Sequence, residues 1–160
     1  MLLVDIHAHL DHEKFSRDLD AVIKRAENAG LKHIITSGVN SATNRLVLKI
    51  ADKYDIVHPS FGLYPIDALA KEIEMGETPG FARDIKPIDV DKELEWIRKN
   101  KRKCIAIGEV GLDYKWGKGK EKEQKINFQK IIETVEKIKN PIIVHSRRAE
   151  FDVIDMLESS

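Results

Sequence analysis

Two histidines close to the start of the chain, His7 and His9, have the spacing of a metal-ligand pair. They follow the short apolar run 2–6, which predicts a β-strand. Side chains two residues apart point to the same face of a strand, so both imidazoles could reach one metal ion. Histidines at this spacing also occur in surface loops that bind nothing. The pair therefore predicts half of a metal site, and the remaining ligands have to come from later segments.

Two further residues of metal-binding type, Glu109 and His145, also follow short apolar runs. If both runs are parallel strands, their carboxyl ends lie at the same edge of one sheet as the end of the run 2–6. A single histidine in such a place is more often a buried group with a hydrogen-bond partner. Four convergent side chains are harder to explain in that way. The sequence therefore predicts a divalent-metal site made by His7, His9, Glu109 and His145.

The elements that would hold these residues alternate between short apolar runs and amphipathic stretches, which is typical of β-α units around a parallel sheet. The apolar runs predict strands at 2–6, 31–36, 56–61, 104–107 and 141–144. Apolar stripes at helical spacing predict helices from a cap at Ser16 to Gly30, from a cap at Asn40 or Ser41 to Ala51, and at 90–100, 121–139 and 149–157.

The pattern also predicts which helix residues are buried and where the chain makes a long connection. Leu46 and Ile126 are expected among the buried residues of their helices. Between Pro65 and Asp91 the pattern loosens, because Gly76, Pro79, Gly80 and Pro87 interrupt a polar segment. We expect a long connection there, which would serve as a functional lid or as variable surface.

Length and composition limit the class of protein. The 160 residues, 42% of them hydrophobic, suffice for one domain with a core, whereas an ordinary eight-stranded barrel needs about 200 or more. Basic and acidic side chains number 27 each, so no general nucleic-acid coat protein is indicated. The single Cys104 favours the cytoplasm and is expected as a buried strand residue rather than a nucleophile. No signal peptide or membrane-spanning run is predicted.

The motifs around the candidate ligands resemble those of a known family. His7-Ala8-His9, then Gly108-Glu109-Val110-Gly111-Leu112-Asp113-Tyr114, then Val144-His145-Ser146-Arg147 match the TatD-like metal-dependent deoxyribonucleases, within the amidohydrolase superfamily, in order and approximate spacing. Gln124 and Phe128 match the helix that follows in the family. The resemblance runs from Leu3 to the end of the chain. It implies an α/β fold of the TIM-barrel type, truncated to about the first five β-α units, with residues 1–160 as a single domain.

By this resemblance, His7 and His9 would bind one divalent ion, Glu109 would bridge two ions as the catalytic carboxylate, and His145 would bind the second ion. Mg, Mn and Zn all accept such ligands. The family's further ligands, a histidine from the sixth strand and an aspartate from the eighth, would lie beyond Ser160. The implied reaction is hydrolysis of DNA by two-metal activation of water, releasing nucleotides from the end of a single strand.

Residues beside these motifs have two interpretations each. Arg147 could bind a substrate phosphate through its guanidinium group or simply lie on the surface. Tyr114 and Trp116 could stack on a base or pack in the core, and the basic run 115–120 could face phosphate or solvent. Tyr64 stands where many family members carry a histidine, so the resemblance leaves open whether this position contacts substrate.

Other polar residues are expected in supporting positions. Asp113 and Asp5 could orient ligands through hydrogen bonds, or Asp113 could only cap a turn and Asp5 could point the other way. His12 is expected either to face solvent or to support a ligand. His33 and His58 fall early in their strands, away from the predicted site, so we expect a structural role for them.

Two alternative functions stay open. The chain could be another amidohydrolase-type ester or amide hydrolase, such as an aminoacyl-tRNA deacylase, or an inactive truncated barrel that acts only as a subunit. An open five-stranded sheet exposes the strands at its two edges, and such edges invite pairing with another chain. We therefore expect either self-association through these edges or a longer protein of which these residues are part.

Overall fold

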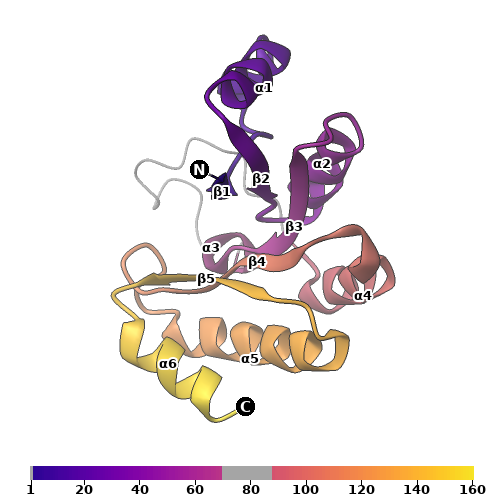
Figure 1. Cartoon of the computed structure of the whole chain (residues 1–160). Helices are drawn as coiled ribbons and strands as arrows, with labels where there is room; N and C mark the ends of the chain where they lie inside the picture. The colour runs from indigo at the N-terminus through magenta and orange to yellow at the C-terminus, as the bar shows by residue number, and fades with distance from the viewer. Residues whose placement is uncertain (1, 70–87) are drawn as a thin grey trace.

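Five parallel strands form one curved sheet in the computed structural model, which describes residues 2–69 and 88–160 (Figure 1). Each strand is hydrogen-bonded to the next one in the sequence, so that spatial order and chain order coincide. This arrangement is half of a TIM-type barrel and confirms the predicted fold class. The strands are β1 (Leu3–Ala8), β2 (Leu31–Ser37), β3 (Val57–Leu63), β4 (Ala106–Asp113) and β5 (Ile142–Arg147).

Helices connect successive strands and lie around the outside of the sheet (Figure 1). Short 3-10 helices at Glu13–Phe15 and Lys101–Lys103 accompany them. The helices are α1 (Leu19–Asn28), α2 (Ser41–Ala51), α3 (Pro65–Ala68), α4 (Val90–Asn100), α5 (Glu121–Ile138) and α6 (Glu150–Glu158).

The helix ends follow the sequence signals with one exception. Asn40 caps α2, because its side chain accepts the N–H of Thr43 while the Thr43 hydroxyl accepts the N–H of Asn40. The prediction that Ser16 caps the first helix is wrong. A 3-10 turn comes first and uses the Ser16 hydroxyl, which donates to the carbonyl of Glu13, so α1 begins after Asp18.

The core lies between the sheet and its outer helices. The largest part joins β3 and β4 to α4 and α5 through Phe61, Ile97, Ile107 and Phe128. A second part joins β2 to α1 and α2 through residues such as Ile23, Ile34 and Ile50. The expectation that Leu46 and Ile126 are buried is wrong, since they are 42% and 50% exposed. Leu46 lies on the flank of the buried stripe of its helix, and Ile126 lies opposite the buried face of α5.

The two outermost strands of the sheet, β1 and β5, each pair with one neighbour within the described residues. Val4 and Ile6 of β1 are exposed, as is Leu2 just before it, and Phe151 is exposed on α6. Self-association through these edges stays a prediction. Gly76, Pro79, Gly80 and Pro87 of the expected long connection lie outside the described residues. No helix within the described ranges is long and apolar enough to cross a membrane.

Candidate metal centre

His7 and His9 lie at the carboxyl end of β1, as predicted, but Glu109 and His145 lie in the middle of strands that are longer than expected. β4 runs to Asp113 and β5 to Arg147, so Glu109 and His145 lie within the ladder rather than after it. Val110 pairs with Val144 and Gly111 with His145. Backbone pairing therefore fixes His145 more firmly than a loop would, whereas Glu109 lies in the irregularity of the ladder between Ile107 and Val110.

Two glycines permit the close approach of backbones beside the site. A Cβ at Gly62 would lie 2.3 Å from the Glu109 nitrogen and 2.4 Å from the Gly38 carbonyl oxygen. A Cβ at Gly111 would lie 2.0 Å from the carbonyl oxygen of His145, and the φ of +144° at Gly111 is one that L side chains rarely adopt. Only glycine fits these two positions without moving the strands that carry the candidate ligands.

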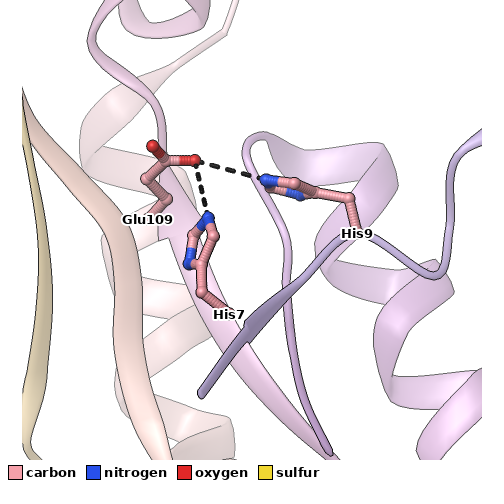
Figure 2. A group of neighbouring side chains, drawn as sticks. All are labelled: His7, His9 and Glu109. Atoms are coloured by element: carbon pink, nitrogen blue, oxygen red, sulfur yellow. Dashed lines mark ion pairs between the residues drawn. The ribbon is translucent and has the colours of Figure 1, made fainter. Parts of the chain in front are cut away.

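His7, His9 and Glu109 form a compact group (Figure 2). His7 extends from β1 and His9 from the residues just after it, and both imidazoles point toward the carboxylate of Glu109 from β4. Oxygen Oε2 of Glu109 lies 3.5 Å from Nε2 of His7 and 3.4 Å from Nε2 of His9. One ligand atom from each residue lies within 4.8 Å of the others.

These separations suit a shared cation better than direct hydrogen bonds. A charge-assisted hydrogen bond between nitrogen and oxygen is about 2.7–2.9 Å long. Two donor atoms that each bind one divalent ion at about 2.0–2.2 Å stand about 2.9–3.5 Å apart. The measured 3.4 and 3.5 Å fall in the second range, so each imidazole is spaced from the carboxylate as two ligands of one divalent ion would be.

His145 meets Glu109 from the other side. Its Nδ1 lies 2.7 Å from Oε1 of Glu109, whereas the first two histidines face Oε2. Its Nε2 lies 3.1 Å from Oδ2 of Asp113, so both ring nitrogens contact carboxylates. The structure thus brings together all four predicted ligands, with one oxygen of Glu109 toward each histidine group.

Ser37, at the end of β2, orients the first two histidines. Nδ1 of His9 donates to the Ser37 carbonyl oxygen at 3.0 Å, which leaves the lone pair on Nε2. The Ser37 hydroxyl lies 3.4 Å from Nδ1 of His7. Sequence reasoning missed this residue, because its contact depends on the register between β1 and β2.

The close contacts among these groups shift their pKa values. Burial alone would raise the pKa of the Glu109 carboxyl, but the neighbouring imidazoles of His145, His7 and His9 hold it well below its usual range. The neighbouring Glu109 carboxylate raises the pKa of His9 against the opposing effect of burial. Burial would lower the pKa of His145, but Asp113 and Glu109 raise it to about 9. The centre therefore keeps an ionised carboxylate to receive a cation.

The polar residues beside the motifs differ in how they contact the candidate site. Asp113 both caps the turn after β4 and contacts His145. Asp5 accepts the backbone N–H of His7 rather than an imidazole proton. His12 is exposed, in line with the first of its two expected roles. Arg147 is 43% exposed at the end of β5, with Nε 4.0 Å from Oδ2 of Asp113, so its guanidinium lies beside the site.

The aromatic residues after β4 are partly buried and pack against core clusters. Tyr114 packs against the large core cluster and donates its hydroxyl to Asp152 at 2.5 Å. Trp116 packs against Val39, Tyr64 and Ile66. Cys104 is buried just before β4, and burial raises its thiol pKa to about 11, as expected for a structural cysteine.

Sequence and structure comparisons agree on the relatives of this chain. It is 33% identical to the uncharacterized metal-dependent hydrolase YabD of Bacillus subtilis, over 98% of this chain and 55% of the relative. It is 30% identical to the human deoxyribonuclease TATDN3, over 98% of this chain and 56% of the relative. It is 26% identical to the 3'-5' ssDNA/RNA exonuclease TatD of Salmonella typhimurium, over 98% of this chain and 54% of the relative.

The crystal structure of the Escherichia coli TatD homologue YjjV superimposes with a TM-score of 0.78 at 25% identity, over 98% of this chain and 55% of that one. The chain thus spans about half the length of the curated relatives it matches. The TatD related DNase family matches residues 4–160. The chain belongs to this family.

Proposed function

We propose that this protein contributes to a divalent-metal-dependent nuclease that hydrolyses phosphodiester bonds of DNA. The observation that carries the proposal is the spacing of His7 Nε2, His9 Nε2 and Glu109 Oε2, which suits a shared cation. The names of the human and Salmonella relatives support a nucleic-acid substrate, and the second supports attack on single strands from the 3' end.

Glu109 is proposed to bridge two ions, of which His7 and His9 hold one and His145 holds the other. Oε2 faces the first two imidazoles and Oε1 faces the third, which supports this division. When bound, two such ions lower the pKa of a water molecule and stabilise the oxygens of the phosphate undergoing displacement. The metal could be Mg, Mn or Zn, since each accepts imidazole and carboxylate.

The remaining residues bind and orient the substrate in this proposal. Arg147 places a half-exposed guanidinium beside Asp113 and His145, where it can donate two hydrogen bonds to a phosphate of the DNA backbone. Its partial pairing with Asp113 keeps the side chain near the site before substrate arrives. Glu109 is ionised and partly buried, so its carboxylate is available to bind a cation.

Nucleotide release from labelled single-stranded DNA tests the proposal. We expect the protein to release nucleotides with at least one of Mg, Mn or Zn, and a chelator to stop the reaction. Glu109→Gln is expected to lower the rate by more than the roughly 100-fold that is typical when a residue supporting a metal ligand is lost. Glu136→Gln, an exposed glutamate on α5, is the matched control and should leave the rate unchanged. Absence of activity, or full activity in Glu109→Gln, would contradict the proposal.

A further inference from the structure

Asp113 is a fully buried carboxylate behind the candidate ligands, at the end of β4. Its Oδ2 accepts hydrogen bonds from the Tyr64 hydroxyl at 2.8 Å and from Nε2 of His145 at 3.1 Å. Its Oδ1 accepts the backbone N–H groups of Lys115 and Trp116. Four donors around one buried carboxylate keep it ionised and immobile.

The backbone of Asp113 is held as firmly as its side chain. The Gln124 amide accepts the N–H of Asp113 at 2.7 Å and donates to the carbonyl oxygens of Asp113 and Gly117 at 3.0 and 3.1 Å. Gln124 itself is 1% exposed within α5. The position of Asp113 is therefore fixed by the packing of α5 against β4.

Tyr64 fixes the same histidine from a second direction. Its ring lies edge-on to the His145 imidazole, with centroids 4.9 Å apart at an angle of 73°. Its hydroxyl donates to the same oxygen of Asp113 that His145 contacts. A tyrosine at this position can thus hold both the ring plane of His145 and the acceptor for its Nε2.

His9 and His145 are held in two opposite ways. In His9, Nδ1 donates to a backbone carbonyl, so Nε2 carries the lone pair that faces Glu109. In His145, Nε2 lies against the Asp113 carboxylate and Nδ1 against Glu109, so an ion that replaces the proton on Nδ1 leaves the Nε2–H to donate to Asp113. A metal ligand's other ring nitrogen usually donates to a carboxylate or carbonyl, which fixes the ring orientation and tautomer.

We propose that Tyr64 and Asp113 are positioning residues for the candidate metal centre: together they hold the Nε2–H of His145, so that its Nδ1 stays directed at Glu109 and at a bound ion. This inference rests on the proposed metal centre and adds the two residues that fix the ring of His145. It also gives Tyr64 a role that requires no contact with substrate.

Zinc binding to protein labelled with ¹⁵N in its histidines tests the inference. Long-range ¹H–¹⁵N spectra distinguish metal-bound, protonated and free ring nitrogens. In the zinc-loaded protein we expect a metal-bound Nδ1 and a protonated Nε2 for His145, and the reverse pattern for His7 and His9. His33 and His58 should show no change on zinc addition, and they serve as internal controls.

Variants of the two supporting residues are measured by the same spectra and by calorimetric zinc titration. Asp113→Asn is expected to weaken zinc binding by about 10- to 100-fold and to remove the distinct pattern of His145, because a carboxamide can stabilise the opposite tautomer. Tyr64→Phe removes one hydroxyl and should weaken binding by less than about 10-fold. Tyr114→Phe and Asp152→Asn are matched controls. They alter a second tyrosine–aspartate hydrogen bond, between Tyr114 just after β4 and Asp152 on α6.

The outcomes separate this inference from the proposed function. Zinc that shifts His7 and His9 but leaves His145 unchanged, or binds it through Nε2, would overturn the inference alone. Unchanged zinc affinity in both Asp113→Asn and Tyr64→Phe would do the same. If the unaltered protein binds no zinc at His7 and His9, the proposed metal centre is wrong and the inference falls with it. Should Asp113→Asn fail to fold, Tyr64→Phe still decides the question.

Discussion

Two pairs of histidines lie at opposite ends of the strands and differ in what surrounds them. His7 and His9, at the carboxyl end of β1, share the carboxylate of Glu109. His33 and His58, early in β2 and β3, contact each other, with Nδ1 of the first 2.8 Å from Nε2 of the second. Across residues 2–69 and 88–160, only the first pair belongs to a group of three metal-binding side chains.

The difference teaches what converts neighbouring imidazoles into a candidate metal centre. The first pair has an ionised carboxylate in front and acceptors behind, so that a lone pair on Nε2 of His9 points inward. The second pair places two groups that become cations on protonation side by side, and burial together with His33 lowers the pKa of His58. The proximity of two histidines is therefore not sufficient.

The largest expected effect concerns removal of one imidazole from each pair. We expect His9→Ala to weaken binding of Mn or Zn by more than about 100-fold, since a ligand is lost rather than a supporting residue. His33→Ala should leave the affinity unchanged. Calorimetric titration of both variants checks the contrast, and equal affinities would remove the distinction between the two ends.

A second prediction concerns the tight backbone packing at the metal end. Gly62→Ala places a methyl group against Glu109 and Gly38, and overpacking of this kind costs about 1–3 kcal/mol or more. We expect a lower free energy of unfolding, measured by urea denaturation, and weaker metal binding. Gly30→Ala is the control, because a Cβ there meets nothing and only its positive φ of +92° is strained. It should leave metal binding unchanged.

A smaller effect is expected from the Ser37 hydroxyl. It lies 3.4 Å from Nδ1 of His7, near the limit of a hydrogen bond, whereas His9 is held by the Ser37 backbone carbonyl, which no side-chain change removes. Ser37→Ala should therefore weaken metal binding by less than about 10-fold. A loss as large as that of His9→Ala would mean that the hydroxyl, rather than Glu109 and the backbone, determines the geometry.

The smallest effect concerns pH and the second pair. The pKa of His58 is lowered from 6.5 in the folded protein, so the unfolded chain binds the proton more readily. The contribution of His58 to the free energy of unfolding is then fully present above about pH 6.5. It is lost as the pH falls from there through the lower pKa that His58 has in the folded protein. The loss should be below about 1 kcal/mol because solvent screens the pair.

Urea denaturation of metal-free protein between pH 7.5 and about 5 measures this slope. His33→Asn removes the charge next to His58 and should reduce the slope of stability against pH. His12→Asn leaves the pair intact and should not change that slope. An identical slope in the His33→Asn variant would show that the pair does not interact.

Much of the fold and the ligand set follows from local signals. The spacing of His7 and His9 needs only the alternation of a strand, and the apolar runs before Glu109 and His145 identify the strands that carry them, although not where those strands end. The helix cap at Asn40 is likewise a local property. Such features are predictable because residues close in the sequence determine them.

The supports of the site were not predictable in the same way. Ser37 meets the histidines through the register of β1 and β2, and Tyr64 meets Asp113 across residues far apart in sequence. The exposure of Leu46 and Ile126 depends on which side of each helix packs against the rest of the protein. The lengths of β4 and β5 depend on pairing between them, which a single sequence segment does not contain.

Anomalous diffraction from crystals of the protein soaked in Mn tests the central claim most directly. We expect an anomalous peak between Nε2 of His7, Nε2 of His9 and Oε2 of Glu109, the three atoms whose separations suit one divalent ion. A peak at His33 and His58 instead, or none beside Glu109, would contradict the claim that the carboxylate and its surroundings distinguish the two histidine pairs.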